Sequence, residues 1–215
     1  MLRYECKMDP LVLLTVLFIT GLIVESMTGA IAAGEHKMDL FGVIVVASVT
    51  AFGGGVIRDI LLGKSPMLII AKPELLFLTS SAALVMVLIA RYFSKLKWLF
   101  LGLDALGLVT FSIVGAIRAQ DMGFGPGVAS IAGITTGVFG GILRDVLCNR
   151  IPLAFQKELY ASVSIASVWL YLGLERLGAP ASLSVPVTLA LGFFLRMLAV
   201  KYDWRIPTFV YKANS

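Results

Sequence analysis

One short motif occurs twice in this chain, first as Phe52-Gly-Gly-Gly-Val-Ile-Arg58-Asp59 and again as Phe139-Gly-Gly-Ile-Leu-Arg144-Asp145. Each copy is followed by a proline, and the arginines, aspartates and prolines of the two copies are all 86 positions apart. Both copies lie inside long apolar segments, where a charged side chain is costly to bury in lipid. A chain that carries such a pair of charges twice, at equivalent places, is expected to use them.

The composition is typical of a protein that crosses a membrane several times. Hydrophobic residues make up 59% of the 215 residues, and charged residues make up 14%, against about 25% in average soluble domains. The net charge of +5 is therefore interpreted through membrane topology. No basic run with interleaved aromatic residues indicates a nucleic-acid partner. The sequence predicts an all-α membrane protein whose surroundings are lipid.

Seven apolar segments predict seven transmembrane helices, each close to the ~20 residues that a bilayer requires. None of the segments shows the alternation of a barrel strand. Helices 2 and 5 of this prediction are expected to be interrupted by the motif glycines, at 53–55 and at 140–141. The expected spans are residues 11–33, 40–62, 73–93, 98–117, 127–147, 159–177 and 184–200.

An internal repeat accompanies the doubled motif. When each residue between 17 and 66 is paired with the residue 86 positions later, about fifteen of the fifty pairs are identical. Three helices make one repeat, so the second copy is expected to enter the membrane from the opposite side, as an inverted repeat. We expect repeat 1 at residues 1–93, repeat 2 at 94–178, and a seventh helix with a cytoplasmic tail at 179–215, all within one membrane domain.

Basic residues predict the orientation of the chain. Without the motif arginines, the side of the N-terminus holds six, namely Arg3, Lys7, Lys64, Lys72, Arg118 and Arg176. The other side holds ten, namely Lys37, Arg91, Lys95, Lys97, Arg150, Lys157, Arg196, Lys201, Arg205 and Lys212. Because short cytoplasmic loops carry the excess of Lys and Arg, we expect the N-terminus outside and the C-terminus in the cytoplasm.

The motif glycines are interpreted as kinks, with close helix packing as the alternative. Each glycine in a helix costs roughly 1 kcal/mol against alanine, so a run of them needs a purpose. A break at membrane depth is tolerated where it lines a water-filled cavity, and carbonyls freed there can ligate a cation. Transient K⁺ binding at such carbonyls is expected, without a resident metal or any other cofactor. The kink glycines are Gly53, Gly54, Gly55, Gly140 and Gly141.

The motif charges are expected to pair across the two-fold axis of the repeat. Arg58 and Asp59 are adjacent, so on a helix they point about 100° apart and are expected to pair poorly with each other. Arg58 would then reach Asp145, and Arg144 would reach Asp59. Such crossed pairs either lock two helices together or border a pore constriction. In a further alternative, the charges reach the interface at the helix ends.

Other polar residues inside the predicted spans are candidates for a pore lining. Glu25 and Asp104 are ionisable and 79 positions apart, so they are not repeat mates, and each is expected to face protein or water. Four hydroxyl side chains are expected either to form hydrogen bonds between helices or to line a pore. They are Ser48, Thr50, Thr135 and Thr136.

Enzyme signatures are missing from the sequence, which has no His-Glu-x-x-His, Gly-x-Ser-x-Gly, P-loop or Cys-x-x-Cys motif. The single histidine, His36, lies in a short polar connection and is expected to be solvated. Cys6 and Cys148 are far apart in the sequence and indicate neither a disulfide framework nor a zinc site. We therefore expect a protein that is not an enzyme.

The two Gly-Gly-x-x-Arg-Asp motifs, each ahead of a proline, resemble those of the prokaryotic TRIC (trimeric intracellular cation) channels, in a chain of similar size. The same family is described as a two-copy glycine transporter domain. The resemblance covers nearly the whole chain. It implies a homotrimer in the cell inner membrane, with one ion pathway per protomer lined by kinked helices 2 and 5. It also implies permeability to K⁺ and Na⁺ that favours potassium.

Residue by residue, the resemblance assigns the five motif glycines to the kinks, and it assigns Arg58, Asp59, Arg144 and Asp145 to the motif charges. The lysine-containing signature of the animal members is absent from the second helix, so regulation by phosphoinositides is not implied. Two function classes stay open. One is a passive cation channel, and the other is a secondary carrier for glycine or another small zwitterion.

Overall fold

The computed structural model describes residues 10–92, 96–156 and 159–204, and all regular structure in these ranges is helical. Seven helices are long, with 16 to 26 residues, whereas α3 is a single turn. The elements are α1 (Pro10–Glu35), α2 (Leu40–Leu61), α3 (Leu68–Ala71), α4 (Leu75–Ala90), α5 (Leu96–Asp121), α6 (Pro126–Leu147), the 3₁₀ turn η1 (Leu153–Phe155), α7 (Tyr160–Arg176) and α8 (Ala181–Lys201).

Local chemistry explains where the helices carrying the motif begin and end. The Asp39 carboxylate accepts the backbone N–H of Gly42 at 2.8 Å and caps α2, and α6 begins at Pro126, whose fixed φ suits a first turn. Two residues beyond the end of each helix lies a residue with positive φ, Gly63 (64°) after α2 and Asn149 (51°) after α6, and these two positions are equivalent in the repeat. The long helices therefore lie within a few residues of the seven predicted spans.

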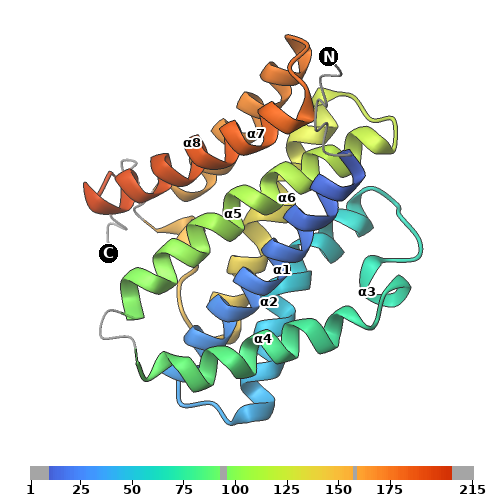
Figure 1. Ribbon diagram of the computed structural model, residues 1–215. Helices are drawn as coiled ribbons and strands as arrows, with labels where there is room; N and C mark the ends of the chain where they lie inside the picture. The colour runs from blue at the N-terminus through green and yellow to red at the C-terminus, as the bar shows by residue number, and fades with distance from the viewer. Residues whose placement is uncertain (1–9, 93–95, 157–158, 205–215) are drawn as a thin grey trace, which may run out of the picture.

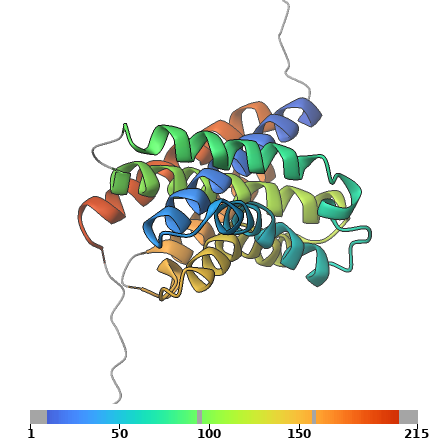
Figure 2. The ribbon, with the colours of Figure 1, turned by 90° about the horizontal axis from the view of Figure 1, so that it is seen from below.

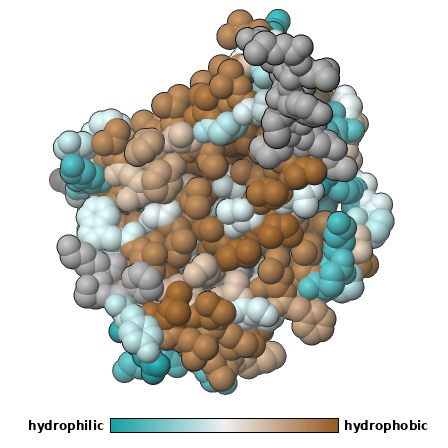
Figure 3. All heavy atoms as spheres, in the orientation of Figure 1, coloured by the Kyte–Doolittle hydropathy of each residue, from teal (hydrophilic) through white to brown (hydrophobic). Residues whose placement is uncertain are grey.

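Five helices are long and apolar enough to cross a membrane by length and composition, namely α1, α2, α5, α6 and α8, as far as the described ranges extend. Helix α4 is apolar but shorter. Most of the face in Figure 3 is apolar, and hydrophilic residues gather at its margins. The prediction of an all-α membrane protein is confirmed. The count of seven spans is not confirmed, because α4 and α7 fall short, and it stays a proposal.

The two parts of the chain related by the offset of 86 run in opposite directions. Helices α1 and α5 lie side by side, and the colours of Figure 1 show that α1 descends where α5 ascends. The motif helices α2 and α6 also pack against each other. In Figures 1 and 2, α1 begins and α8 ends at opposite sides of the molecule. This arrangement is what an inverted repeat would produce, although the expected boundary at 93/94 lies outside the described residues.

Motif glycines bring α2 and α6 together in a reciprocal contact. A Cβ added to Gly54 would lie against the carbonyl oxygen of Thr136, and a Cβ added to Gly140 would lie against that of Thr50. The pairs are related by the offset of 86, since Gly54 corresponds to Gly140 and Thr50 to Thr136. Close approach of two helix backbones requires residues without a side chain at the crossing.

The expected interruption of helices 2 and 5 at the glycines is wrong for this structure. Both α2 and α6 continue as α-helix through their motifs, so the glycine carbonyls are not freed for cations. Kinks are not confirmed, and the packing alternative accounts for Gly54 and Gly140. The reason is that the gain from close contact between two helices offsets the helical cost of glycine, so the backbone does not need to unwind.

Candidate functional site

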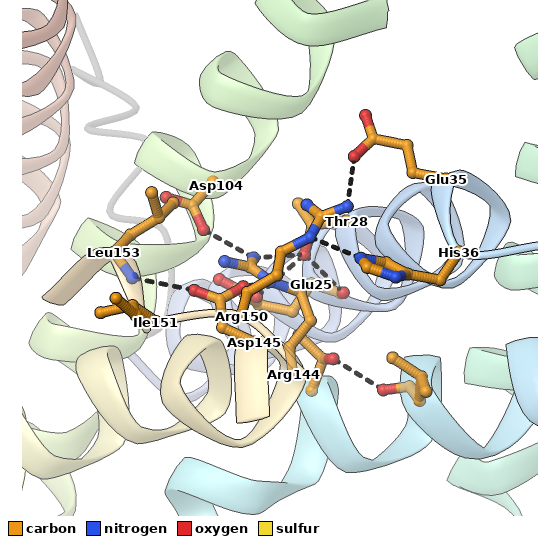
Figure 4. Close-up of polar contacts among 12 residues, drawn as sticks. Glu25, Thr28, Glu35, His36, Asp104, Arg144, Asp145, Arg150, Ile151 and Leu153 are labelled. Carbon is orange, nitrogen blue, oxygen red and sulfur yellow. Dashed lines mark hydrogen bonds and ion pairs between the residues drawn. The ribbon is translucent and has the colours of Figure 1, made fainter. Parts of the chain in front are cut away.

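A group of buried charged side chains lies where α1, α5, α6 and α7 meet. Glu25 comes from α1, Asp104 from α5, Arg144 and Asp145 from α6, and Tyr160 from α7. None of the five is more than 2% exposed. Figure 4 shows the first four converging on one point between the helices. Burial of so many ionisable groups in one place is expensive and marks a functional candidate.

Arg144 is the centre of this group. Its Nε donates to Asp145 Oδ1 at 2.9 Å, and its Nη1 donates to Asp104 Oδ1 at 2.7 Å. The same Nη1 is 3.3 Å from Thr28 Oγ1 on α1. The ring of Phe100 lies 4.6 Å from the guanidinium carbon, one helical turn before Asp104 on α5. A planar guanidinium that reaches two carboxylates and a ring fixes α5 against α6.

Asp145 also holds the chain that leaves α6. Its second oxygen, Oδ2, accepts the backbone N–H of Leu153 at 2.9 Å. Asp59 does the same for the chain that leaves α2, because its Oδ2 accepts the N–H of Leu68 at 3.2 Å. In both motif copies the aspartate therefore ties the end of its helix to the segment that follows the proline.

Tyr160 connects the group to the last helix. Its hydroxyl donates to Asp104 Oδ1 at 3.3 Å, and its ring lies 4.7 Å from the guanidinium carbon of Arg196 on α8. Arg196 is fully buried. The prediction of orientation counted it among the cytoplasmic charges, so the count becomes six against nine. Its direction is unchanged, although several of the residues in it lie outside the described ranges.

Glu25 is the least satisfied member. Its Oε2 lies 3.2 Å from Thr28 Oγ1, and its Oε1 has no hydrogen-bond partner among the residues described. A Cβ at Gly107 would collide with the Glu25 carboxyl, so the glycine makes the space that this carboxyl occupies on α5. Asp104 Oδ2 and Arg144 Nη2 also have no hydrogen-bond partner among the described residues.

The crossed pairs expected from the repeat are wrong. Arg58 donates from Nη2 and Nε to Asp59 Oδ1, at 2.7 and 3.0 Å, and Arg144 bonds to Asp145 and Asp104. The prediction treated each side chain as a fixed direction from the helix axis. Arginine has a long flexible stem that folds back to its neighbour, and each aspartate is held at the helix end by the following segment.

The four hydroxyl side chains that were candidates for a pore lining do not have the same surroundings. Thr50 and Thr136 donate to carbonyls one turn earlier in their own helices, Val46 and Ala132, at 2.6 Å, so their hydroxyl hydrogens are used within α2 and α6. Ser48 Oγ lies 3.5 Å from Thr79 Oγ1 on α4, as expected for a contact between helices. Thr135 is buried.

The other motif glycines pack against side chains. A Cβ at Gly53 would meet Leu143 at 2.5 Å, and one at Gly55 would lie 3.7 Å from Arg58 Nη2. A Cβ at Gly141, the repeat mate of Gly55, would lie 3.5 Å from Arg144 Nη2. Sequence reasoning missed Thr28, Phe100, Tyr160 and Arg196. For two of them a signal existed, because Thr28 and Phe100 lie three and four residues from Glu25 and Asp104, on the same helical faces.

A second polar contact lies at the surface, beyond the end of the buried group (Figure 4). Arg150 donates to Glu35 Oε2 and to His36 Nε2, both at 2.6 Å. His36 is exposed, as expected, but it is bonded to Arg150 rather than only to solvent. This contact fastens the end of α1 to the segment after α6. Within the described ranges, no cluster of three or more His, Cys, Asp and Glu side chains offers a metal site.

Comparisons with known proteins identify the family. A family model described as "Glycine transporter" matches the chain twice, at residues 15–91 and 101–176. The UPF0126 inner membrane protein YadS of Escherichia coli is 34% identical over 92% of this chain and 96% of its own length. The UPF0126 membrane protein YvgT of Bacillus subtilis is 36% identical over 93% and 98%.

Solved structures agree with the sequence relatives. The TRIC trimeric intracellular cation channel orthologue from Rhodobacter sphaeroides superposes with a TM-score of 0.85 and 31% identity, covering 89% of this chain and 98% of that one. These relatives are channels and membrane proteins, and the chain is accordingly not an enzyme, as the missing motifs predict. The chain belongs to the prokaryotic TRIC family of integral inner membrane proteins, the family that the glycine transporter model describes.

Proposed function

We propose that the chain forms a potassium-permeable monovalent cation channel, which also passes Na⁺, as a homotrimer with one ion pathway in each protomer. The observation that carries the proposal is the likeness, over nearly the full length of both chains, to a trimeric intracellular cation channel. A buried polar group between helices that are otherwise apolar supports it, because ionisable side chains at membrane depth mark ion pathways.

The buried group supplies a reason for cation selectivity. Three carboxyl groups, those of Glu25, Asp104 and Asp145, surround the one guanidinium of Arg144. An excess of acidic groups along a narrow pathway raises the local concentration of cations. We place the pathway between α1, α5 and α6, along this group. The motif charges Arg144 and Asp145 border it, and Thr135 on α6 lines its approach.

One observation favours the alternative, a carrier for glycine or another small zwitterion. Within the buried group, three atoms have no hydrogen-bond partner among the described residues: two acid oxygens, Glu25 Oε1 and Asp104 Oδ2, and one guanidinium nitrogen, Arg144 Nη2. This set matches the ammonium and the carboxylate of a free amino acid. The channel is preferred because the solved structure that is similar over the whole fold is that of a channel.

Two assays on the purified protein separate the candidates. In planar bilayers across an asymmetric potassium chloride gradient, a channel gives unitary currents whose reversal potential lies near that of potassium and which do not saturate like a carrier. In liposomes, a carrier gives saturable counterflow of labelled glycine. Counterflow without cation current would overturn the channel proposal, and light scattering that shows a monomer or dimer would overturn the trimer.

The topology belongs to the same proposal: seven spans, an inverted repeat of residues 1–93 and 94–178, and a further helix with its tail at 179–215. The N-terminus lies outside and the C-terminus in the cytoplasm, as the count of basic residues favours. A Lys7→Cys variant, with Cys6 and Cys148 replaced, should react with an impermeant thiol reagent on intact cells. Reaction only after permeabilisation would reverse the orientation.

A further inference from the structure

The Glu25 carboxyl has no positive partner of its own in the buried group. Arg144 already bonds to Asp145 through Nε and to Asp104 through Nη1, at 2.9 and 2.7 Å. Among the described residues, the hydrogen-bond contact of the Glu25 carboxyl is with the Thr28 hydroxyl, and its Oε1 lies against the α5 backbone at Gly107. A buried carboxylate without a counter-ion costs several kcal/mol, and the usual way to avoid that cost is to bind a proton.

Counting hydrogens at Thr28 leads to the same conclusion. A hydroxyl has one hydrogen, and Thr28 Oγ1 is 2.8 Å from the backbone carbonyl of Glu25 but 3.2 Å from its carboxyl oxygen Oε2. The hydroxyl also accepts from Arg144 Nη1, at 3.3 Å. With its hydrogen spent on the shorter bond, Thr28 has none for Oε2. The contact is a hydrogen bond if Oε2 itself carries the hydrogen and donates to Thr28.

The surrounding charges favour the same state. Asp104 from α5 and Asp145 from α6 repel a negative Glu25, and Arg144 is the one cation that acts on it in return. Tyr160 from α7 is a neutral donor to Asp104. Helix α4 has no ionisable side chain between Leu75 and Ala90, and on α2 the charges of Arg58 and Asp59 bond to each other. On α8, Arg196 lies behind the ring of Tyr160.

We propose that Glu25 is a proton-exchange site, protonated in this closely packed arrangement and ionised when a permeant monovalent cation enters between Glu25 and Asp104. This inference rests on the proposed channel function and names its regulation by protons. The O–H bond at Glu25 breaks, the proton passes to a water molecule in the pathway, and the carboxylate and Asp104 Oδ2 then coordinate the cation. Protons and permeant cations therefore compete for one place in each protomer.

Packing explains why the exchange involves a structural change. Glu25, Asp104 and Arg144 are at most 1% exposed, and the backbone at Gly107 lies directly against the Glu25 carboxyl, so the closed pocket has room for a proton but not for a hydrated cation. Gly107 keeps the α5 wall against the carboxyl. Entry of a cation therefore requires α1 and α5 to separate at this point. Acidification favours the packed arrangement and lowers conduction.

The decisive variant is Glu25→Gln, because an amide copies the shape and the hydrogen-donating capacity of a protonated carboxyl. In bilayers, wild-type conductance should rise as the baths are made alkaline. Glu25→Gln should show little response to pH and a conductance about tenfold below wild type at the alkaline end, equivalent to 1.4 kcal/mol in a barrier. Glu74→Gln, at an exposed acid outside the site, should respond like wild type.

A spectroscopic measurement does not depend on conduction or on the variant folding. In wild-type protein, the infrared carbonyl band of a protonated carboxylic acid should lose intensity when potassium chloride replaces choline chloride. A band that is absent, or that is insensitive to potassium, would overturn the inference. Cation currents with the same pH response in wild type and Glu25→Gln would also overturn it, while the channel itself stands. Absence of any cation current in wild type would overturn the channel proposal.

Discussion

The two motif copies have the same backbone role but different surroundings. Around Arg144, α1 contributes Glu25 and α5 contributes Asp104. At the positions 86 residues away, α5 has Phe111 in place of Glu25, and α1 has Phe18 in place of Asp104. The rings of these two phenylalanines lie 6.3 Å apart. The surroundings of the second motif therefore form a charged pocket, where the equivalent surroundings of the first motif are aromatic.

The glycines show how closely the two halves correspond. Gly107 leaves room for the Glu25 carboxyl, and its repeat mate Gly21 leaves room for the Phe111 ring, 2.7 Å from an added Cβ. Beside the phenylalanines is a cavity of about 10 Å³ lined in part by Gly55 and Leu68. The fold therefore forms the same recess twice. A carboxyl group fills the recess at Gly107, and an aromatic ring fills the recess at Gly21. Under the proposal above, the pocket with Glu25 and Asp104 is the one that exchanges protons and holds a cation.

The strongest test of this difference is removal of each motif arginine. Arg144→Gln leaves two buried carboxylates without their cation, whereas Arg58→Gln leaves one, which keeps its bond from Leu68. Breaking one buried pair typically costs about 3–5 kcal/mol, so Arg144→Gln should abolish the recovery of assembled protein. Arg58→Gln should lower it. Size-exclusion chromatography in detergent measures both, with half-exposed Arg118→Gln as the control. Equal losses would contradict the comparison.

The aspartates should show the reverse order of effects. Asp59 is the ion-pair partner of Arg58 in the described part of the chain, so Asp59→Asn leaves a buried guanidinium without a counter-ion. The expected loss is about 1.5–3 kcal/mol, the range for hydrogen bonds to charged groups. Asp104→Asn removes one of the two acids that pair with Arg144 and leaves the other in place, so thermal stability in detergent should change little. A larger loss of stability for Asp104→Asn than for Asp59→Asn would contradict this order of effects.

At the helix crossing the two halves should behave alike. Alanine at Gly54 or Gly140 drives a methyl group into a backbone carbonyl of the facing helix, and such overpacking costs about 1–3 kcal/mol. Gly102→Ala is the matched control, because an added Cβ meets nothing there and alanine favours the helix by about 1 kcal/mol. The melting temperature should therefore fall for Gly54→Ala and for Gly140→Ala, and it should rise for Gly102→Ala. Clearly unequal losses at Gly54 and Gly140 would show that the crossing is not two-fold symmetric.

Much of the fold followed from the sequence because apolar length and the offset of 86 are direct physical signals. The long helices, the contact between the two motifs and the membrane class were predicted on that basis. The crossed arginine pairs were not found in the structure, because reasoning from symmetry assigns each motif residue a partner in the other copy. Symmetry cannot describe positions where the copies differ, and Glu25 and Asp104 are such positions.

A signal for the buried group was nevertheless present in the alignment of the two halves. Glu25 stands opposite Phe111 and Asp104 opposite Phe18, so each acid replaces a large apolar residue inside a span. Two replacements of this kind, one in each half, are costly in lipid unless they meet the same cation. Side-chain reach decides that the cation is Arg144 rather than Arg58. It also brings in Tyr160 and Arg196, whose contacts depend on how α7 and α8 dock.

The smallest expected difference concerns the residues just after the two motifs. Cys148 is 1% exposed at the end of α6, in an apolar cluster with residues such as Ala30 and Met86, whereas its repeat mate Leu62 is only half-buried. Burial raises the pKa of the Cys148 thiol, so at neutral pH less of the reactive thiolate is present.

Maleimide labelling of two variants tests this difference. The first variant carries Cys6→Ala and keeps Cys148, and the second carries Cys6→Ala, Cys148→Ala and Leu62→Cys. Maleimide should label the first variant about tenfold more slowly than the second. Because the pKa is raised, the rate at Cys148 should keep rising with pH after the rate at position 62 has levelled. Equal rates with the same pH profile would mean that the ends of α2 and α6 are packed alike, and that the asymmetry of the two halves is confined to the charged pocket.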